Sequence, residues 1–336
     1  MMTHKELFFR RLAGKPVDKI PNLNIVMLFA AKHAGIKYGQ FCSDYRYLVE
    51  AQEKTAEDFG IDILSTMSDP FRETNDYGAS IAFAEDNLPI CKKAFLTGPE
   101  DFSMIKIWDP LESTRMLDRI RAVEMFKRDL GDQYPVLGWV EGALAEFMDL
   151  TTVSDGMMMI MDEPEAVSEL MERITEQAIL CAKAQIAAGA DVIGIGDAVA
   201  SLVGAGLYRE QVLPLETKLI NAIHSLGAKT KLHICGNINH LLPDMMETGS
   251  DIIDIDYMVD FEKAIDLSEG KCSISGHVNP VQVLLQGTPE EVKRWTKYCV
   301  EKGNNTNFIS GGCEVPKMTP DENLKAVDEQ LRAMAH

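Results

Sequence analysis

Short apolar runs alternate with longer helical segments along most of the chain. Eight runs have the length and the flanking residues of buried strands, and they cover residues 20–27, 61–67, 135–140, 191–195, 230–234, 251–255, 272–275 and 307–310. Alternation of this kind predicts a parallel sheet in the α/β class. Eight repeats favour a single (β/α)8 TIM barrel. A doubly wound open sheet is the alternative, but no glycine-rich phosphate-binding fingerprint follows the first run.

The helical segments carry start and stop signals of their own. Thr3 and Glu6 have the spacing of a capping box at the start of a helix over residues 3–12. Residues 45–59 have helical period, and Gly60 follows where a C-terminal glycine belongs. Further helices are expected over residues 114–130, 163–189, 213–226, 241–248, 261–267, 289–302 and 320–335.

Two features describe the organisation of the whole chain. Residues 71–93 are polar and are expected to form a hairpin excursion over one end of the fold. No segment has the character of a linker between domains, so residues 1–336 are expected to form one barrel.

Polar side chains follow most of the predicted strands. In a TIM barrel the chemistry lies at the carboxyl ends of the strands, and here these ends carry Asp69, Glu141, Asp197, His233 with Cys235, Asp256, His277 with Asn279, and Cys313. An aspartate in such a position is more often the N-cap of the next helix than a catalytic group. The convergence of three zinc-type ligands, His233, Cys235 and Cys313, on one rim nevertheless predicts a metal site there.

The strongest chemical signal is the pair His233 and Cys235. Side chains alternate along a strand, so these two point the same way while Ile234 points into the packing. Cys313 follows another strand that reaches the same rim. One histidine and two cysteines are the ligand set of a catalytic zinc that keeps its fourth position open. The alternative is one partly buried histidine and two core cysteines.

Composition narrows the class of protein. The net charge of −19 makes nucleic acid and anionic membranes poor partners. The seven cysteines are scattered without a CxxC pair, which indicates a reducing compartment rather than a disulfide framework. No apolar run approaches the roughly 18 residues of a membrane span, and the first residues lack a signal-peptide core. We therefore expect a cytoplasmic protein.

Several motifs resemble the uroporphyrinogen decarboxylase superfamily, in the correct order and over nearly the whole chain. They are GKPVDKIP at residues 14–21, GWVEG at 138–142, GADVI at 189–193 leading to Asp197, GHVNP at 276–280 and GGCEVPKMTPDEN at 311–323. The resemblance implies a (β/α)8 barrel, in agreement with the strand count.

This chain differs from the decarboxylases of the superfamily at two places. Decarboxylases carry an arginine-rich segment after the first strand, whereas residues 26–33 are largely apolar and contain no arginine. Decarboxylases also carry a histidine after the last strand, where this chain has Cys313. Asp69 does lie where the catalytic aspartate of the decarboxylases falls, so a metal-free decarboxylase stays open as an alternative.

The pattern of His233, Cys235 and Cys313 is similar to that of the zinc methyltransferases of corrinoid systems. The resemblance implies these three residues as Zn²⁺ ligands, with Asp256 as the fourth before substrate binds. It also implies methylcobalamin carried by a partner corrinoid protein, and a thiol such as coenzyme M as methyl acceptor. The apolar residues 26–29 and the excursion at 71–93 would suit a docking surface, or would be core and lid.

Other functions use a similar set of residues. A corrinoid-dependent demethylase would pass the methyl of a methoxylated or methylamine substrate to cobalt(I), with Glu141 and Glu146 moving a proton. A scaffold with a structural zinc would need a fourth Cys or His ligand, and none is well placed. The candidate catalytic residues are Asp69, Glu141, Asp197 and Asn279. The sequence does not identify the methyl donor or acceptor, and a homodimer is compatible with it.

Overall fold

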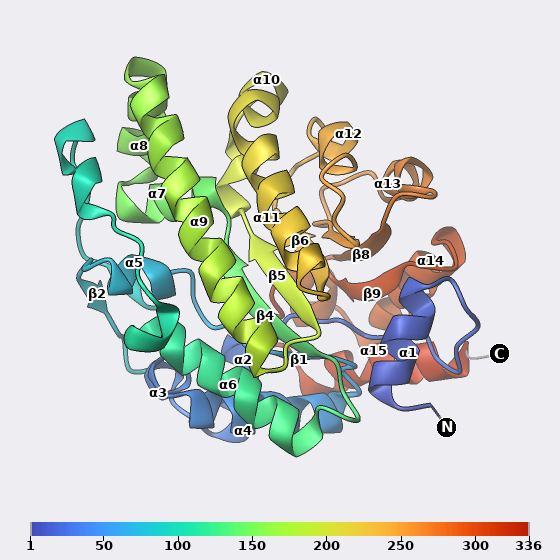
Figure 1. Ribbon diagram of the computed structural model, residues 1–336. Coiled ribbons are helices and arrows are strands. Elements are labelled where there is room, and N and C mark those ends of the chain that lie inside the picture. Colours follow the sequence, from blue (N-terminus) through green and yellow to red (C-terminus); the bar gives the residue numbers. More distant parts are fainter. Residues whose placement is uncertain (1, 335–336) are drawn as a thin grey trace.

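A curled parallel sheet lies at the centre of the molecule, as the computed structural model of residues 2–334 shows (Figure 1). Its seven strands are hydrogen-bonded in the order β1-β4-β5-β6-β7-β8-β9, all of them parallel. Their bounds are β1 Leu64–Ser65, β4 Val136–Glu141, β5 Val192–Gly196, β6 Lys229–His233, β7 Ile252–Asp254, β8 Ser273–Val278 and β9 Phe308–Gly311. Each of them falls at a predicted strand.

The segment around Asn22 takes the eighth position, between β9 and β1. Leu23 N–H donates to Ile309 O at 2.8 Å on one side, and Asp62 N–H donates to Asn22 O at 2.8 Å on the other. Only Asn22 forms a ladder bridge, so this strand is far shorter than the predicted run 20–27. The (β/α)8 prediction is confirmed, with one strand reduced to a single bridge.

Side chains replace the missing ladder bonds of this segment. Asp62 Oδ2 accepts from Asn22 N–H at 2.6 Å, and Asn24 Oδ1 accepts from Gly311 N–H at 2.7 Å. The chain then turns into a helix at Leu28. Residues Val26, Met27 and Phe29 are buried, so this apolar stretch is core and not an exposed docking surface.

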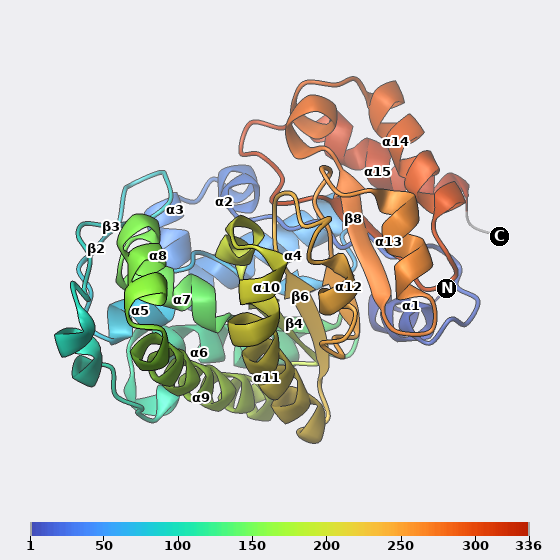
Figure 2. The same cartoon turned by 90° about the horizontal axis from the view of Figure 1, so that it is seen from above.

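Helices cover the outer face of the sheet, and α6, α9 and α11 lie over strands β4 to β6 (Figures 1 and 2). The predicted capping box is present at Thr3 and Glu6, and α4 ends at Gly60 in the left-handed conformation. The helices are α1 His4–Leu12, α2 Leu28–Ala34, α3 Tyr38–Ser43, α4 Tyr45–Phe59, α5 Arg72–Asp76, α6 Arg115–Leu130, α7 Ala143–Leu150, α8 Val153–Asp162, α9 Pro164–Ala188, α10 Ala205–Leu207, α11 Leu213–Ser225, α12 Leu242–Met245, α13 Phe261–Ser268, α14 Pro289–Lys302 and α15 Asp321–Ala333.

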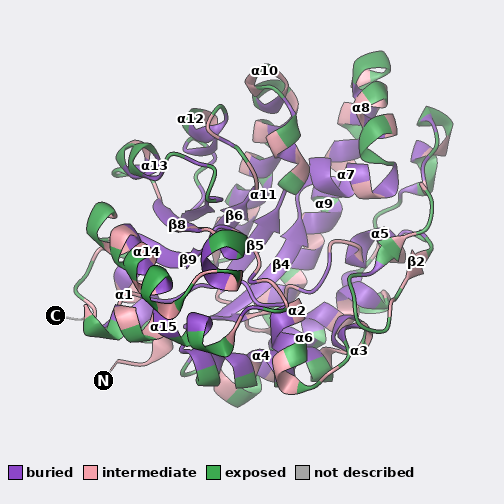
Figure 3. Cartoon of the chain, turned by 180° about the vertical axis from the view of Figure 1, so that it is seen from behind, coloured by how far each residue is buried: buried purple, intermediate pink, exposed green. Residues whose placement is uncertain are grey.

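Short elements fill the connections at the carboxyl edge of the sheet. The excursion at 71–93 consists of α5 followed by two antiparallel strands, β2 Ile81–Ala82 and β3 Ile90–Cys91. Short 3-10 and π-helical segments form η1 Pro99–Met104, η2 Pro110–Glu112, η3 Ala198–Leu202, η4 Tyr208–Val212 and η5 Pro280–Leu285. The strands of the seven-stranded sheet and the inner helix faces are mostly buried, whereas exposed residues lie on the outer helix faces and the loops (Figure 3). None of the helices within residues 2–334 is long and apolar enough to span a membrane.

Candidate metal site

The structure brings His233, Cys235 and Cys313 together at the carboxyl edge of the sheet. His233 is the last residue of β6, Cys235 lies two residues later, and Cys313 lies two residues after β9. One ligand atom from each lies within 4.8 Å of the other two. Strands β7 and β8 separate β6 from β9 in the sheet. Only the curl of the barrel therefore brings the three side chains to one point.

The chemistry of these three side chains fits Zn²⁺. The two thiols lie close together, and their interaction lowers the pKa of Cys235 and raises that of Cys313. One sulfur is thus prepared to carry negative charge, and the other holds a proton that a divalent cation would displace. His233 is buried and the two cysteines are half-buried. Two sulfurs and one nitrogen match a zinc site with an open fourth position.

Two carboxylates hold the loops that carry the cysteines. Asp256 accepts from Gly236 N–H through Oδ2 at 2.8 Å and from Tyr257 N–H through Oδ1 at 2.6 Å. Glu314 accepts from Leu28 N–H at 2.7 Å, and burial raises its pKa to about 7. Asp256 is not in the group of atoms within 4.8 Å of one another. Because backbone donors engage both of its oxygens, its role as fourth ligand stays a prediction.

Glu141 and Asp197 are buried at the carboxyl ends of β4 and β5. Burial raises the pKa of Glu141 well above its usual value, and one of its oxygens accepts from Trp139 Nε1–H at 2.8 Å. Burial also raises the pKa of Asp197 to about 7, against the opposing effect of backbone donors. Its Oδ1 accepts from Ala145 N–H at 2.8 Å. Asp197 therefore holds the start of α7 instead of capping the helix that follows it in the chain.

Asp69 is bound to an arginine that the sequence did not point to. Arg115 donates through both terminal nitrogens to the two carboxylate oxygens, at 2.9 and 2.8 Å, and both side chains are buried. Ser68 Oγ–H donates to Asp69 Oδ2 at 2.7 Å as well. These contacts hold the carboxylate in a fixed position, and the catalytic role of Asp69 stays a prediction.

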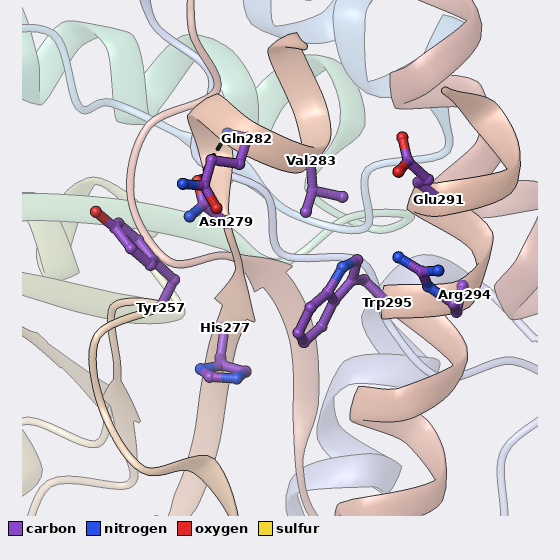
Figure 4. Close-up of a pocket in the computed structure, with 8 residues that line it drawn as sticks. All are labelled: Tyr257, His277, Asn279, Gln282, Val283, Glu291, Arg294 and Trp295. Carbon is purple, nitrogen blue, oxygen red and sulfur yellow. Dashed lines mark hydrogen bonds between the residues drawn. The ribbon is translucent and has the colours of Figure 1, made fainter. Parts of the chain in front are cut away.

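Asn279 lines a cavity of about 370 Å³, as do Tyr257 and His277 (Figure 4). The Oδ1 of Asn279 accepts from the N–H groups of Val281 and Gln282, at 3.0 and 2.9 Å, and so caps η5. Tyr257 lines the same cavity, and a side chain on Gly312 would meet Tyr257 N at 2.5 Å. The cavity is thus adjacent to the loop that carries Cys313.

Sequence reasoning missed two buried residues next to His233. Lys231 lies two residues earlier on β6, and Asp254 pairs with His233 in the register of β6 and β7. The alternation of Lys231 and His233 along one strand was a usable signal for the first. Asp254 stands inside a predicted apolar run, and only the strand register places it opposite His233.

Known proteins with similar sequences include methyltransferases of similar length. The family described as uroporphyrinogen decarboxylase (URO-D) matches residues 3–334. A protein of Methanosarcina mazei named methylcobamide:CoM methyltransferase MtbA is 28% identical over 335 residues, which cover 97% of each chain. MtaA of Methanosarcina barkeri, with the same activity in its name, is 31% identical over 65% of this chain and 64% of its own.

A solved structure described as a methyltransferase from Methanosarcina mazei has the same fold. Its TM-score is 0.90 at 23% identity, over 99% of both chains. Uroporphyrinogen decarboxylases are also similar to this chain, for example that of Carboxydothermus hydrogenoformans, at 22% identity over 88% of this chain and 85% of its own.

Proposed function

The chain belongs to the uroporphyrinogen decarboxylase (URO-D) family, and we propose that within it the protein is a zinc-dependent methyltransferase that moves a methyl group between a corrinoid protein and a thiol. The observation that carries the proposal is the meeting of His233, Cys235 and Cys313 within 4.8 Å. Relatives named methylcobamide:CoM methyltransferases, which align with 97% of the chain, support the same proposal. Coenzyme M is accordingly the first thiol to test.

The three side chains would hold Zn²⁺ through one nitrogen and two sulfurs. The ion would lower the pKa of a thiol substrate and so supply a thiolate at neutral pH. The two cysteine thiolates keep the charge of the site low, so that a substrate sulfur stays nucleophilic. Asp256 and Glu314 fix the loops of Cys235 and Cys313 through backbone N–H groups. The residues of this chain thereby set the geometry into which a thiol enters.

The mouth of the barrel suits a protein that carries methylcobalamin. Exposed apolar side chains lie on the loops after β5, β7, β8 and β9, and these are Leu202, Tyr257, Met258, Val281 and Met318. Because the strands are parallel, all of these loops are at the same edge as the cysteines. Exposed apolar groups gathered around a site are typical of a surface that binds another protein. We propose that the corrinoid protein docks there with its cofactor over the site.

The first test is the metal content. Protein purified without chelator is expected to hold about one zinc per chain, because three side chains with an open position are the usual catalytic zinc site. Elemental analysis on the intact protein measures this directly. A preparation that holds no zinc and takes up none on addition would contradict the proposal and leave the metal-free decarboxylase as the better reading.

A further inference from the structure

Three buried polar side chains lie next to one another at the candidate metal site, and one of them is His233 itself. Lys231 and His233 lie on β6 and are two residues apart, so they point to the same face of the strand. Asp254 on β7 is the register partner of His233. The three residues are only 1%, 4% and 3% exposed. Buried charges are costly unless they are paired, so this group needs a structural or chemical explanation.

The contacts in this group centre on one carboxylate oxygen. Asp254 Oδ2 forms an ion pair with Lys231 Nζ and also lies 3.3 Å from His233 Nδ1. The alignment falls short of a hydrogen bond, so Nδ1 is left without a partner among residues 2–334, and Asp254 Oδ1 has none either. A small rotation of the imidazole would let Nδ1–H donate to the carboxylate.

We infer that Asp254 is the positioning residue of His233. It accepts a hydrogen bond from Nδ1–H and so leaves Nε2 free to bind the metal, while Lys231 balances the charge of the carboxylate and holds it in place. Histidine ligands of metals usually donate their other N–H to a carboxylate or a carbonyl, and this fixes the tautomer and the ring orientation. The inference rests on the metal site of the proposed function and adds two residues to it.

In this arrangement Asp254 acts on the site through His233, since its Oδ2 lies 3.3 Å from Nδ1 of that residue. Asp254 is outside the group of three side chains whose ligand atoms lie within 4.8 Å of one another.

The opposite end of the same two strands offers a matched control. Asp251 there binds Lys229 Nζ at 2.8 Å and His224 Nε2 at 2.7 Å, so it has the same kinds of partner. It precedes β7, whereas Asp254 ends it, and it is thus remote from the cysteines. Removing this second pair removes comparable contacts without touching the candidate site.

The test measures the zinc dissociation constant of variants by competition with a chromophoric chelator. Lys231→Met/Asp254→Leu removes both charges, so that neither is left unpaired in the interior. It is expected to bind zinc about ten- to a hundredfold more weakly than the wild type. Lys231→Met/Asp254→Asn keeps an oxygen acceptor for Nδ1–H and is expected to lose less. Lys229→Met/Asp251→Leu is expected to keep the wild-type constant.

A measurement on the wild type does not depend on the folding of any variant. In cadmium-loaded protein with isotope-labelled histidine, we expect the proton of His233 on Nδ1 and the coupling to the metal on Nε2. Coupling on Nδ1 would overturn the inference, and so would a folded Lys231→Met/Asp254→Leu protein with unchanged zinc affinity. A wild type that binds no zinc refutes the proposed function instead. A wild type that binds zinc without methyl transfer still allows both measurements.

Discussion

Replacing Cys313 with serine or His233 with alanine is expected to abolish metal binding and methyl transfer while the barrel still folds. Each substitution removes one of the three ligand side chains. The metal affinity should therefore fall by more than the roughly ten- to hundredfold that follows the loss of a hydrogen-bond partner of a ligand. Both residues lie at or beyond the carboxyl end of a strand, where barrels place function and not stability. Zinc content, methyl transfer and circular dichroism of each variant give the three readouts.

Cys272→Ser is the matched control for these variants. Cys272 is a half-buried cysteine that directly precedes β8, at the edge opposite the candidate site. Its replacement should leave zinc content and methyl transfer as in the wild type. If Cys313→Ser or His233→Ala retained stoichiometric zinc and full activity, the ligand assignment would be wrong.

Replacing Arg115 with methionine is expected to lower the free energy of unfolding by about 3–5 kcal/mol, because it leaves Asp69 as an unpaired charge in the interior. The two side chains share a pair of hydrogen bonds at 2.9 and 2.8 Å, and both are buried. The double variant Asp69→Leu/Arg115→Met removes both charges and should regain much of the loss. Urea unfolding of the three proteins measures this, and an Arg115→Met protein as stable as the wild type would contradict it.

The same ion pair predicts a dependence on pH. Burial alone would raise the pKa of Asp69, but the guanidinium of Arg115 outweighs it and holds the pKa below the usual value. Because the folded pKa lies below the unfolded one, near 4 for aspartate, the contribution is complete above that pH and is lost as the pH falls further. The double variant should therefore lose less stability between neutral pH and pH about 3 than the wild type does. An identical loss would exclude the ion pair as a source of acid sensitivity.

Local signals were sufficient for most of the elements. Thr3 with Glu6, and Gly60 after α4, mark helix ends through contacts within one turn, and these contacts are present. The helices α7 and α8 were not predicted. Nearly every residue of α7 is buried, so it has no polar face from which a helical period can be read. The reduced strand at Asn22 depends on Asp62 and Gly311, which are remote in sequence.

Local signals were also sufficient for only part of the candidate site. The spacing of His233 and Cys235 is local and could be read from the chain. Cys313 could be read from its place after the last predicted strand, and the family resemblance implied the same three ligands. The partners of the other polar groups could not be predicted. Arg115 lies 46 residues after Asp69, and Ala145 lies 52 residues before Asp197. These contacts follow from barrel closure and strand register, which bring together residues that are far apart in the sequence.

Methyl transfer from methylcobalamin to a thiol tests the central claim most directly. In this reaction the carbon–cobalt bond breaks, a carbon–sulfur bond forms, the thiol proton is released and cobalt(I) leaves with the electron pair. With zinc-loaded protein and coenzyme M we expect the methyl–cobalt absorption band to disappear as methylated thiol accumulates, and to persist with Cys313→Ser. A band that persists with wild-type protein and every small thiol, together with methyl–cobalt formation from a methoxylated or methylamine substrate and cobalt(I), would contradict the proposed function.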